Sequence, residues 1–158
     1  MFKMVGKLQY DPDRGGLRNR VGEKQRTNWW AVVNVSRELT RYYRWLTCKE
    51  VPGLRLHAPA FDAHVSLIRG ERPRPGTEHL WKKYDGELIT MMVNPFVQIS
   101  DEKNTGKFFF LEVECERMSQ IREEFGFPTK WKYHLTIGRT WSIEQIEHQR
   151  MCEMKAAA

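Results

Sequence analysis

The chain of 158 residues contains one short pattern twice, and this repetition limits the folds that the chain can adopt. Each copy is a His, an apolar residue, a hydroxyl residue and, five positions after the His, an Arg. The first cassette is His64-Val-Ser66-Leu-Ile-Arg69, and the second is His134-Leu-Thr136-Ile-Gly-Arg139. Side chains two positions apart on an extended strand point to the same face, so each cassette places an imidazole beside a hydroxyl. We therefore expect two equivalent strands that face one cleft.

The length and charge of the chain narrow the class of protein. A chain of this size can build one buried core but not two ordinary domains, so we expect a single domain over residues 1–158, and the repeat described above divides it into two lobes. Lys and Arg total 26 against 20 Asp and Glu, which gives a net charge of +6 that is spread along the sequence. A mild, dispersed positive charge suits a small anionic ligand better than a long nucleic acid. Protein partners remain unknown at this point.

Cysteine usage and the first residues predict the compartment. The three cysteines, Cys48, Cys115 and Cys152, are an odd number without paired spacing, which argues against a disulfide framework and against a zinc site. The N-terminus lacks the apolar stretch of a signal peptide, and no segment approaches the roughly 20 apolar residues of a membrane span. We expect a protein of the cytoplasm that has no membrane contact.

The order of predicted elements is similar in the two halves. We expect strands at 3–10, 29–35, 62–68, 88–99, 109–116 and 132–137, and helices at 36–48, 78–84, 118–125 and from 142 onward. The polar stretch 11–27 predicts a long basic loop. Each half thus holds a strand, a helix, a connection and a cassette strand. Because no glycine-rich phosphate loop follows a strand, we predict an α+β fold with two mainly antiparallel sheets and outer helices.

Two such cassettes would supply the groups that break a phosphodiester without a metal. One neutral imidazole can accept a proton, one protonated imidazole can donate a proton, and the hydroxyls of Ser66 and Thr136 can stabilise the phosphoryl oxygens. Histidines that sit in strands with no catalytic duty are the alternative. We predict no metal or other cofactor, because only Asp62 joins the two histidines in register as a further ligand type.

Four segments give the chain a resemblance to a known family. The paired His-x-Ser/Thr motifs resemble the two-histidine (2H) phosphoesterase superfamily, and the flanking residues look like those of the phage anti-CBASS proteins, which degrade cyclic oligonucleotide alarm signals. The similar segments are Arg41-Tyr-Tyr-Arg-Trp45, Asp62-Ala-His-Val-Ser-Leu-Ile-Arg-Gly-Glu71, His79-Leu-Trp-Lys-Lys-Tyr84 and His134-Leu-Thr-Ile-Gly-Arg-Thr140. The resemblance spans about residues 29–141, and Ser66 stands where the family commonly has Thr.

This resemblance implies a fold, an activity and a set of catalytic residues. It implies a bilobal fold around a cleft and metal-independent cleavage of 3′-5′ bonds in cyclic di- and trinucleotides, which blocks CBASS signalling in an infected bacterium. His64, Ser66, His134 and Thr136 take the motif positions. The loop 11–27 and the terminal helix align with nothing in the family, so the resemblance implies no role for them.

The residues two positions before each His suggest which imidazole is the acid. Asp62 precedes His64, and its carboxylate favours imidazolium, whereas the ammonium of Lys132 disfavours imidazolium at His134. We therefore predict His64 as the acid and His134 as the base. The substrate's own 2′-hydroxyl would attack, a 2′,3′-cyclic phosphate would form first, and the pH profile would be bell-shaped.

Five further residues are predicted to bind the substrate. Arg69 and Arg139 lie an odd number of steps from their histidines and reach the same face only if each strand ends or bulges first, which Gly70 and Gly138 permit. Surface solvation is the alternative for both. Lys132 is a further contact. The two aromatic residues Tyr10 and Trp141 are predicted to stack on bases, with core packing as the alternative.

Two other functions fit the same residues. One is a 2′,3′-cyclic phosphodiesterase or ligase that acts on RNA ends. The other is a sponge that sequesters signalling nucleotides without cleaving them. The sequence does not determine base preference, ring size, final product or oligomeric state, because these depend on loops that shape the cleft.

Overall fold

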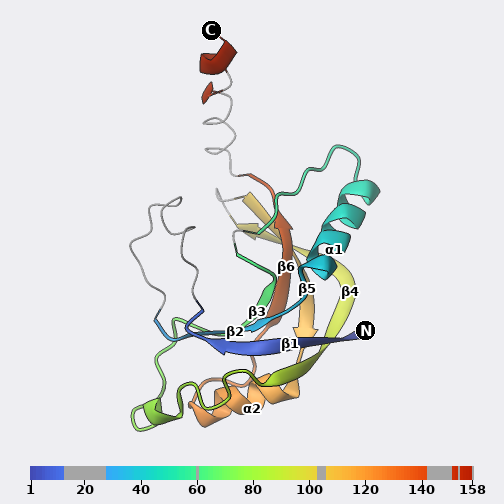
Figure 1. Cartoon of the computed structure of the whole chain (residues 1–158). Helices are drawn as coiled ribbons and strands as arrows, with labels where there is room; N and C mark the ends of the chain where they lie inside the picture. The colour runs from blue at the N-terminus through green and yellow to red at the C-terminus, as the bar shows by residue number, and fades with distance from the viewer. Residues whose placement is uncertain (13–27, 60, 103–105, 142–150, 153, 158) are drawn as a thin grey trace.

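The computed structural model describes residues 1–12, 28–59, 61–102, 106–141, 151–152 and 154–157. Its elements in chain order are β1 (Phe2–Tyr10), β2 (Trp30–Asn34), α1 (Arg37–Glu50), β3 (His64–Arg69), the 3₁₀ turn η1 (Glu78–Leu80), β4 (Leu88–Glu102), β5 (Gly106–Glu114), α2 (Glu116–Glu124) and β6 (Tyr133–Arg139). Figure 1 shows α1 beside β5 and β6, and α2 below β1 and β4.

The strands form one closed sheet in the order β1-β2-β3-β6-β5-β4, and every neighbouring pair is antiparallel. Each half of the chain contributes two strands, a helix and a cassette strand, and the two halves occur in mirrored order around the contact between β3 and β6. The predicted α+β class and antiparallel pairing are confirmed. Two sheets were expected, whereas the described strands form one, because β3 pairs with β6 and β1 pairs with β4, so that the halves join along two edges.

Helix α1 forms where the sequence predicts it, for local reasons. The side chain of Ser36 accepts a hydrogen bond from the backbone N–H of Glu38 at 3.3 Å and caps the first turn. The inward stripe of the helix buries Thr40, Tyr43 and Thr47. The helix dipole favours a negative charge in the first turn, where Glu38 lies, and a positive charge in the last turn, where Lys49 lies.

The second half follows the predicted order of elements, but several bounds differ: β5 begins three residues and α2 two residues earlier than predicted. Helix α2 ends before Gly126, whose φ of 77° is the left-handed conformation that glycine adopts at little cost. The helix predicted at 78–84 is only the short turn η1, followed by turns. Strand β4 runs three residues past its predicted end, because residues 100–102 pair with residues 106–108 of β5.

A single apolar core lies between the helices and one face of the sheet. Helix residues Tyr43, Met118, Ile121 and Phe125 join sheet residues that include Val65, Leu67, Leu111, Leu135 and Ile137 in that core. Consequently the opposite face of β3 and β6 is not covered by α1 or α2. The cassette histidines and hydroxyls lie on this uncovered face.

Two predicted segments fall mainly outside the described residues. The loop predicted at 11–27 is described only at residues 11 and 12, and the terminal helix predicted from 142 is described only at 151–152 and 154–157, which are helical. Within the described residues, no helix is long and apolar enough to cross a membrane.

Candidate active site

Pairing between β3 and β6 brings the two cassettes together. Val65 is the partner of Leu135, and both side chains are fully buried in the core. Their sequence neighbours therefore point to the other face, where His64, Ser66 and Thr136 are half-buried and His134 is exposed. In an antiparallel pair the residue before one partner lies across from the residue after the other, which sets His64 across from Thr136 and Ser66 across from His134.

Each imidazole ring has a hydrogen bond to the backbone of the residue two positions before it. The Nδ1 atom of His64 lies 2.7 Å from the carbonyl oxygen of Asp62, and the ring of His134 is hydrogen-bonded to the backbone of Lys132. A carbonyl oxygen can only accept, so Nδ1 of His64 carries the proton of that bond. This arrangement leaves Nε2 of His64 as the nitrogen that can exchange a proton with a ligand.

Each cassette contains a bulge one residue after its hydroxyl residue. Along β2, Ala31 pairs with Ile68 while Val32 pairs with Ser66, so Leu67 is an extra residue on β3. The same shift occurs between β5 and β6: Phe109 pairs with Gly138 and Phe110 with Thr136, which leaves Ile137 extra. A bulge of this kind resets which face the following side chains occupy.

The bulges return the cassette arginines to the face of the histidines. Leu67 and Ile68 are both buried, and Arg69 then emerges on the uncovered face; Ile137, Gly138 and Arg139 repeat this order. Bulges were the condition that the sequence set for these arginines, and that condition is confirmed. In the first cassette the bulge lies at Leu67 and not at Gly70.

The two arginines have different surroundings. The guanidinium carbon of Arg69 lies 5.6 Å from the ring centre of Trp30, and its charge acts on His134 across the strand pair. Arg139 exchanges two backbone hydrogen bonds with His57, of 2.8 and 3.0 Å. Its charge also helps to lower the pKa of His57, after burial of that ring.

The electrostatic surroundings of His134 favour its neutral form. Although the ring remains open to solvent, partial burial by the surrounding protein lowers its pKa, and the positive charge of Arg69 lowers it further. The hydrogen bond to the backbone of Lys132 opposes this shift. A lowered pKa agrees with the direction predicted for His134, but the predicted cause, the Lys132 ammonium, is wrong.

The predicted effect of the Asp62 carboxylate on His64 stays a prediction, but the structure shows two contacts of Asp62. The carboxylate of Asp62 lies 3.1 Å from the guanidinium of Arg37, in an exposed ion pair. It is the carbonyl oxygen of Asp62 that the ring of His64 contacts. Asp62 therefore orients His64 through its backbone, while its charge is shared with Arg37.

Aromatic side chains that the sequence reading did not single out surround both rings. Trp30, at 6% exposed, donates from Nε1 to Oγ of Ser66 at 3.5 Å, and its ring centre lies 6.0 Å from that of His64. Phe61 lies 6.3 Å from His64 and 5.3 Å from Trp30. Phe110 lies 5.5 Å from His134. Trp30 and Phe110 come from the strands that flank β3 and β6, so only the sheet order could reveal them.

The remaining predicted contacts are placed differently. Tyr10 is only 4% exposed, and its ring packs edge-on against Trp81 with the ring centres 4.8 Å apart, so it belongs to the core and not to the uncovered face. Trp141 is half-buried, 4.5 Å from His57, just beyond the second cassette. Lys132 is exposed and contacts His134 through its backbone.

A polar pocket of about 270 Å³ adjoins the first cassette. It is lined by Gln9, Pro12, Asn34, Val35, Arg37, Asp62 and Ala63. Asn34 is the strand partner of His64, and it donates to Gln9 at 2.7 Å. Amide, carboxylate and guanidinium groups beside a candidate acid offer both donors and acceptors to a polar ligand.

The uncovered face of β3 and β6 thus combines two imidazoles, two hydroxyls and two guanidinium groups. Such a set can transfer protons in both directions and stabilise an anion. Within the described residues, no three His, Cys, Asp or Glu side chains gather closely enough to hold a metal ion. Comparisons of the chain with family models, with curated proteins and with solved structures found no match.

Proposed function

We propose that this protein is a metal-independent phosphodiesterase that cleaves 3′-5′ bonds in cyclic di- and trinucleotides and releases linear products. One observation carries the proposal: the pairing of Val65 with Leu135 sets His64 and His134 on the same face of neighbouring strands. A general acid and a general base must reach opposite sides of one phosphate, and two adjacent strands allow this.

The proposed reaction needs only groups that the chain or the substrate supplies. The ribose 2′-hydroxyl beside the scissile phosphate is the nucleophile, and the substrate itself holds it in place. Neutral His134 removes its proton, and protonated His64 gives a proton to the departing 5′-oxygen. The hydroxyls of Ser66 and Thr136 donate to the phosphoryl oxygens, and a 2′,3′-cyclic phosphate end forms first.

The lowered pKa of His134 supports its assignment as the base. A base acts in its neutral form, and both burial and the charge of Arg69 favour that form at neutral pH. Arg69 gains a second function in this scheme, because a guanidinium near the base also attracts the phosphate.

The choice of cyclic oligonucleotides as substrate comes from the resemblance of the cassettes and their flanks to anti-CBASS proteins. The net charge of +6 and the aromatic residues beside the histidines suit an anionic ligand with stacking bases. Under this proposal the halves act as two lobes around one cleft, and the protein acts in the cytoplasm of an infected bacterium, where it removes a defence signal.

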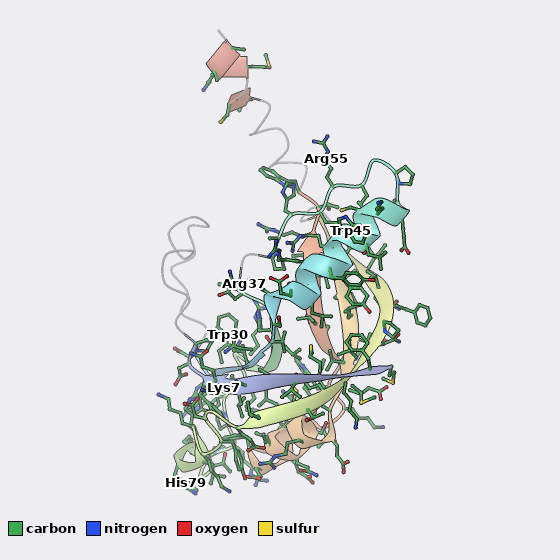
Figure 2. The ribbon with its side chains drawn as sticks, turned by 45° about the vertical axis from the view of Figure 1, so that its right-hand side comes forward. Lys7, Trp30, Arg37, Trp45, Arg55 and His79 are labelled. Atoms are coloured by element: carbon green, nitrogen blue, oxygen red, sulfur yellow. The ribbon has the colours of Figure 1, made fainter. Side chains whose placement is uncertain are left out.

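The test is incubation of a panel of cyclic di- and trinucleotides with the protein in EDTA, followed by chromatography. We expect linear products from wild type. The single variants His64→Ala and His134→Ala should each lose roughly 10²–10⁴-fold in kcat. His79→Ala is the matched control, because this exposed histidine belongs to η1 and lies apart from Trp30 in Figure 2.

Four outcomes would contradict the proposal. Absence of linear product, or product that forms only when metal is added, would reject the mechanism. Intact nucleotide recovered from a tight complex would favour a sponge. Cleavage of 2′,3′-cyclic phosphates on RNA fragments without cleavage of cyclic dinucleotides would place the same residues in an enzyme of RNA ends.

A further inference from the structure

The two cassette bulges share a feature beyond their position: each bulge carbonyl accepts a hydrogen bond from an arginine. Nη1 of Arg122 donates to the carbonyl oxygen of Leu67 at 2.8 Å, and Nη1 of Arg44 donates to that of Ile137 at 3.0 Å. Leu67 and Ile137 are the extra residues of the two bulges. A bulge removes residues from the regular ladder, so its carbonyl needs another donor when it is buried.

Each arginine comes from the helix of the other half of the chain. Arg44 lies on α1, which belongs to the first half, and it contacts the second cassette. Arg122 lies on α2, in the second half, and contacts the first cassette. The two contacts are thus reciprocal, and each couples the geometry of a cassette to the packing of a distant helix.

The surroundings of both arginines restrict their movement. Arg122 is fully buried; its guanidinium also donates to both carboxylate oxygens of Glu71 at 2.8 Å and to the carbonyl oxygen of Pro128 at 3.0 Å. Arg44 is half-buried, and a Cβ added to Gly138 would lie 3.3 Å from its Cδ. Position 138 therefore favours glycine, which lets Arg44 approach the strand closely.

We propose that Arg44 and Arg122 are positioning residues that hold the bulges and thereby set the catalytic geometry of the second and the first cassette respectively. The bulge begins at the residue after the hydroxyl and ends just before the cassette arginine. Its shape determines where the hydroxyl of Thr136 and the guanidinium of Arg139 lie, and likewise those of Ser66 and Arg69. This inference rests on the proposed function for its effect on activity, but its structural part can be tested without activity.

The kinetic test uses Arg44→Met, because Arg44 is less buried than Arg122 and its loss disturbs the fold less. Displacing a catalytic group by about 1 Å costs on the order of 100-fold in rate, so we expect kcat to fall by about 10- to 100-fold with KM little changed. Arg41→Met is the matched control on the same helix, since Arg41 is exposed and forms an ion pair with Glu38 at 2.9 Å. It should retain wild-type kcat.

A double-mutant cycle separates positioning from a general loss of structure. If Arg44 acts through the second cassette, Arg44→Met should add little to the loss caused by Thr136→Val, yet keep its full effect in the Ser66→Ala background. A general structural defect would lower kcat by the same factor in both backgrounds. Equal factors in the two backgrounds would overturn the proposal.

Backbone amide NMR spectra of the free protein supply the readout that needs no activity. Arg44→Met should shift the amide resonances of residues 136–139 and leave those of 66–69 unchanged, whereas Arg41→Met should shift neither set. Unchanged resonances at 136–139 would overturn the positioning claim even in an active enzyme. Shifted resonances in a protein that cleaves no nucleotide would retain the bulge contact and reject the proposed function instead.

Discussion

Replacing Arg122 by Met tests how much of the fold depends on one buried cation. Arg122 has no exposed surface and makes four side-chain hydrogen bonds, two of them to Glu71 and one each to the carbonyl oxygens of Leu67 and Pro128. Its guanidinium also stacks over Trp131 at 4.3 Å. Methionine retains much of the apolar stem but leaves the Glu71 carboxylate and two carbonyls without this donor.

The expected loss is large because Arg122 is fully buried, while its partner Glu71 keeps 24% of its side chain exposed and would lose its cation. Removing one partner of such a pair costs about 3–5 kcal/mol in the free energy of unfolding. For a domain of this size each kcal/mol corresponds to about 2–4 °C, so the unfolding midpoint should fall by roughly 6–20 °C. The exposed pair of Arg41 with Glu38 provides the contrast, since Arg41→Met should cost less than about 1 kcal/mol.

Urea denaturation monitored by tryptophan fluorescence, together with calorimetry, measures both variants against wild type. Glu71→Gln is a useful third protein, because it keeps the shape of the partner while removing its charge. If Arg122→Met loses no more stability than Arg41→Met, the reasoning from burial and hydrogen bonding is refuted. If Arg122→Lys loses as much stability as Arg122→Met, a positive charge alone does not suffice and the planar guanidinium fork is required.

Three further predictions concern the site itself. Arg69→Gln removes a positive charge that lowers the pKa of His134, so the pKa of His134 should rise in an NMR titration. If His134 is the base, the acidic limb of the kcat/KM profile moves to higher pH, and activity at low pH falls. An unmoved His134 titration would contradict the placement of Arg69. Trp30→Phe keeps a ring beside His64 but removes the N–H donor to Ser66. We expect this substitution to lower kcat several-fold in the wild-type background and to have no further effect in the Ser66→Ala background. An equal fall of kcat in both backgrounds would show that Trp30 does not act through Ser66. Gly138→Ala places a Cβ 3.1 Å from both the carbonyl oxygen of His57 and Cβ of Leu56. This overpacking should lower the free energy of unfolding, measured by chemical denaturation, by about 1–3 kcal/mol. An unchanged denaturation midpoint would show that residues 55–58 move to make room for the methyl group.

Much of the architecture follows from patterns of short range. Alternating side chains predict β1, β5 and both cassette strands, and the Ser36 cap predicts α1, because these features depend on neighbours a few residues away. The repeated cassette predicts two equivalent halves, and the mirrored strand order agrees with it. Tyr10 shows the limit of such reasoning. Its place at the end of a strand beside a basic loop suggested a ligand contact, whereas in the structure its side chain is buried in the core.

The pairing of an imidazole with a hydroxyl on each of two strands can be predicted from the sequence, because it depends only on the period of an extended chain. Tertiary structure alone decided that these strands are neighbours, that one-residue bulges turn Arg69 and Arg139 back to the same face, and that Arg44 and Arg122 reach the bulge carbonyls. The two bulge-carbonyl contacts join residues 55 and 93 positions apart, and no local sequence pattern specifies the partners of such backbone hydrogen bonds.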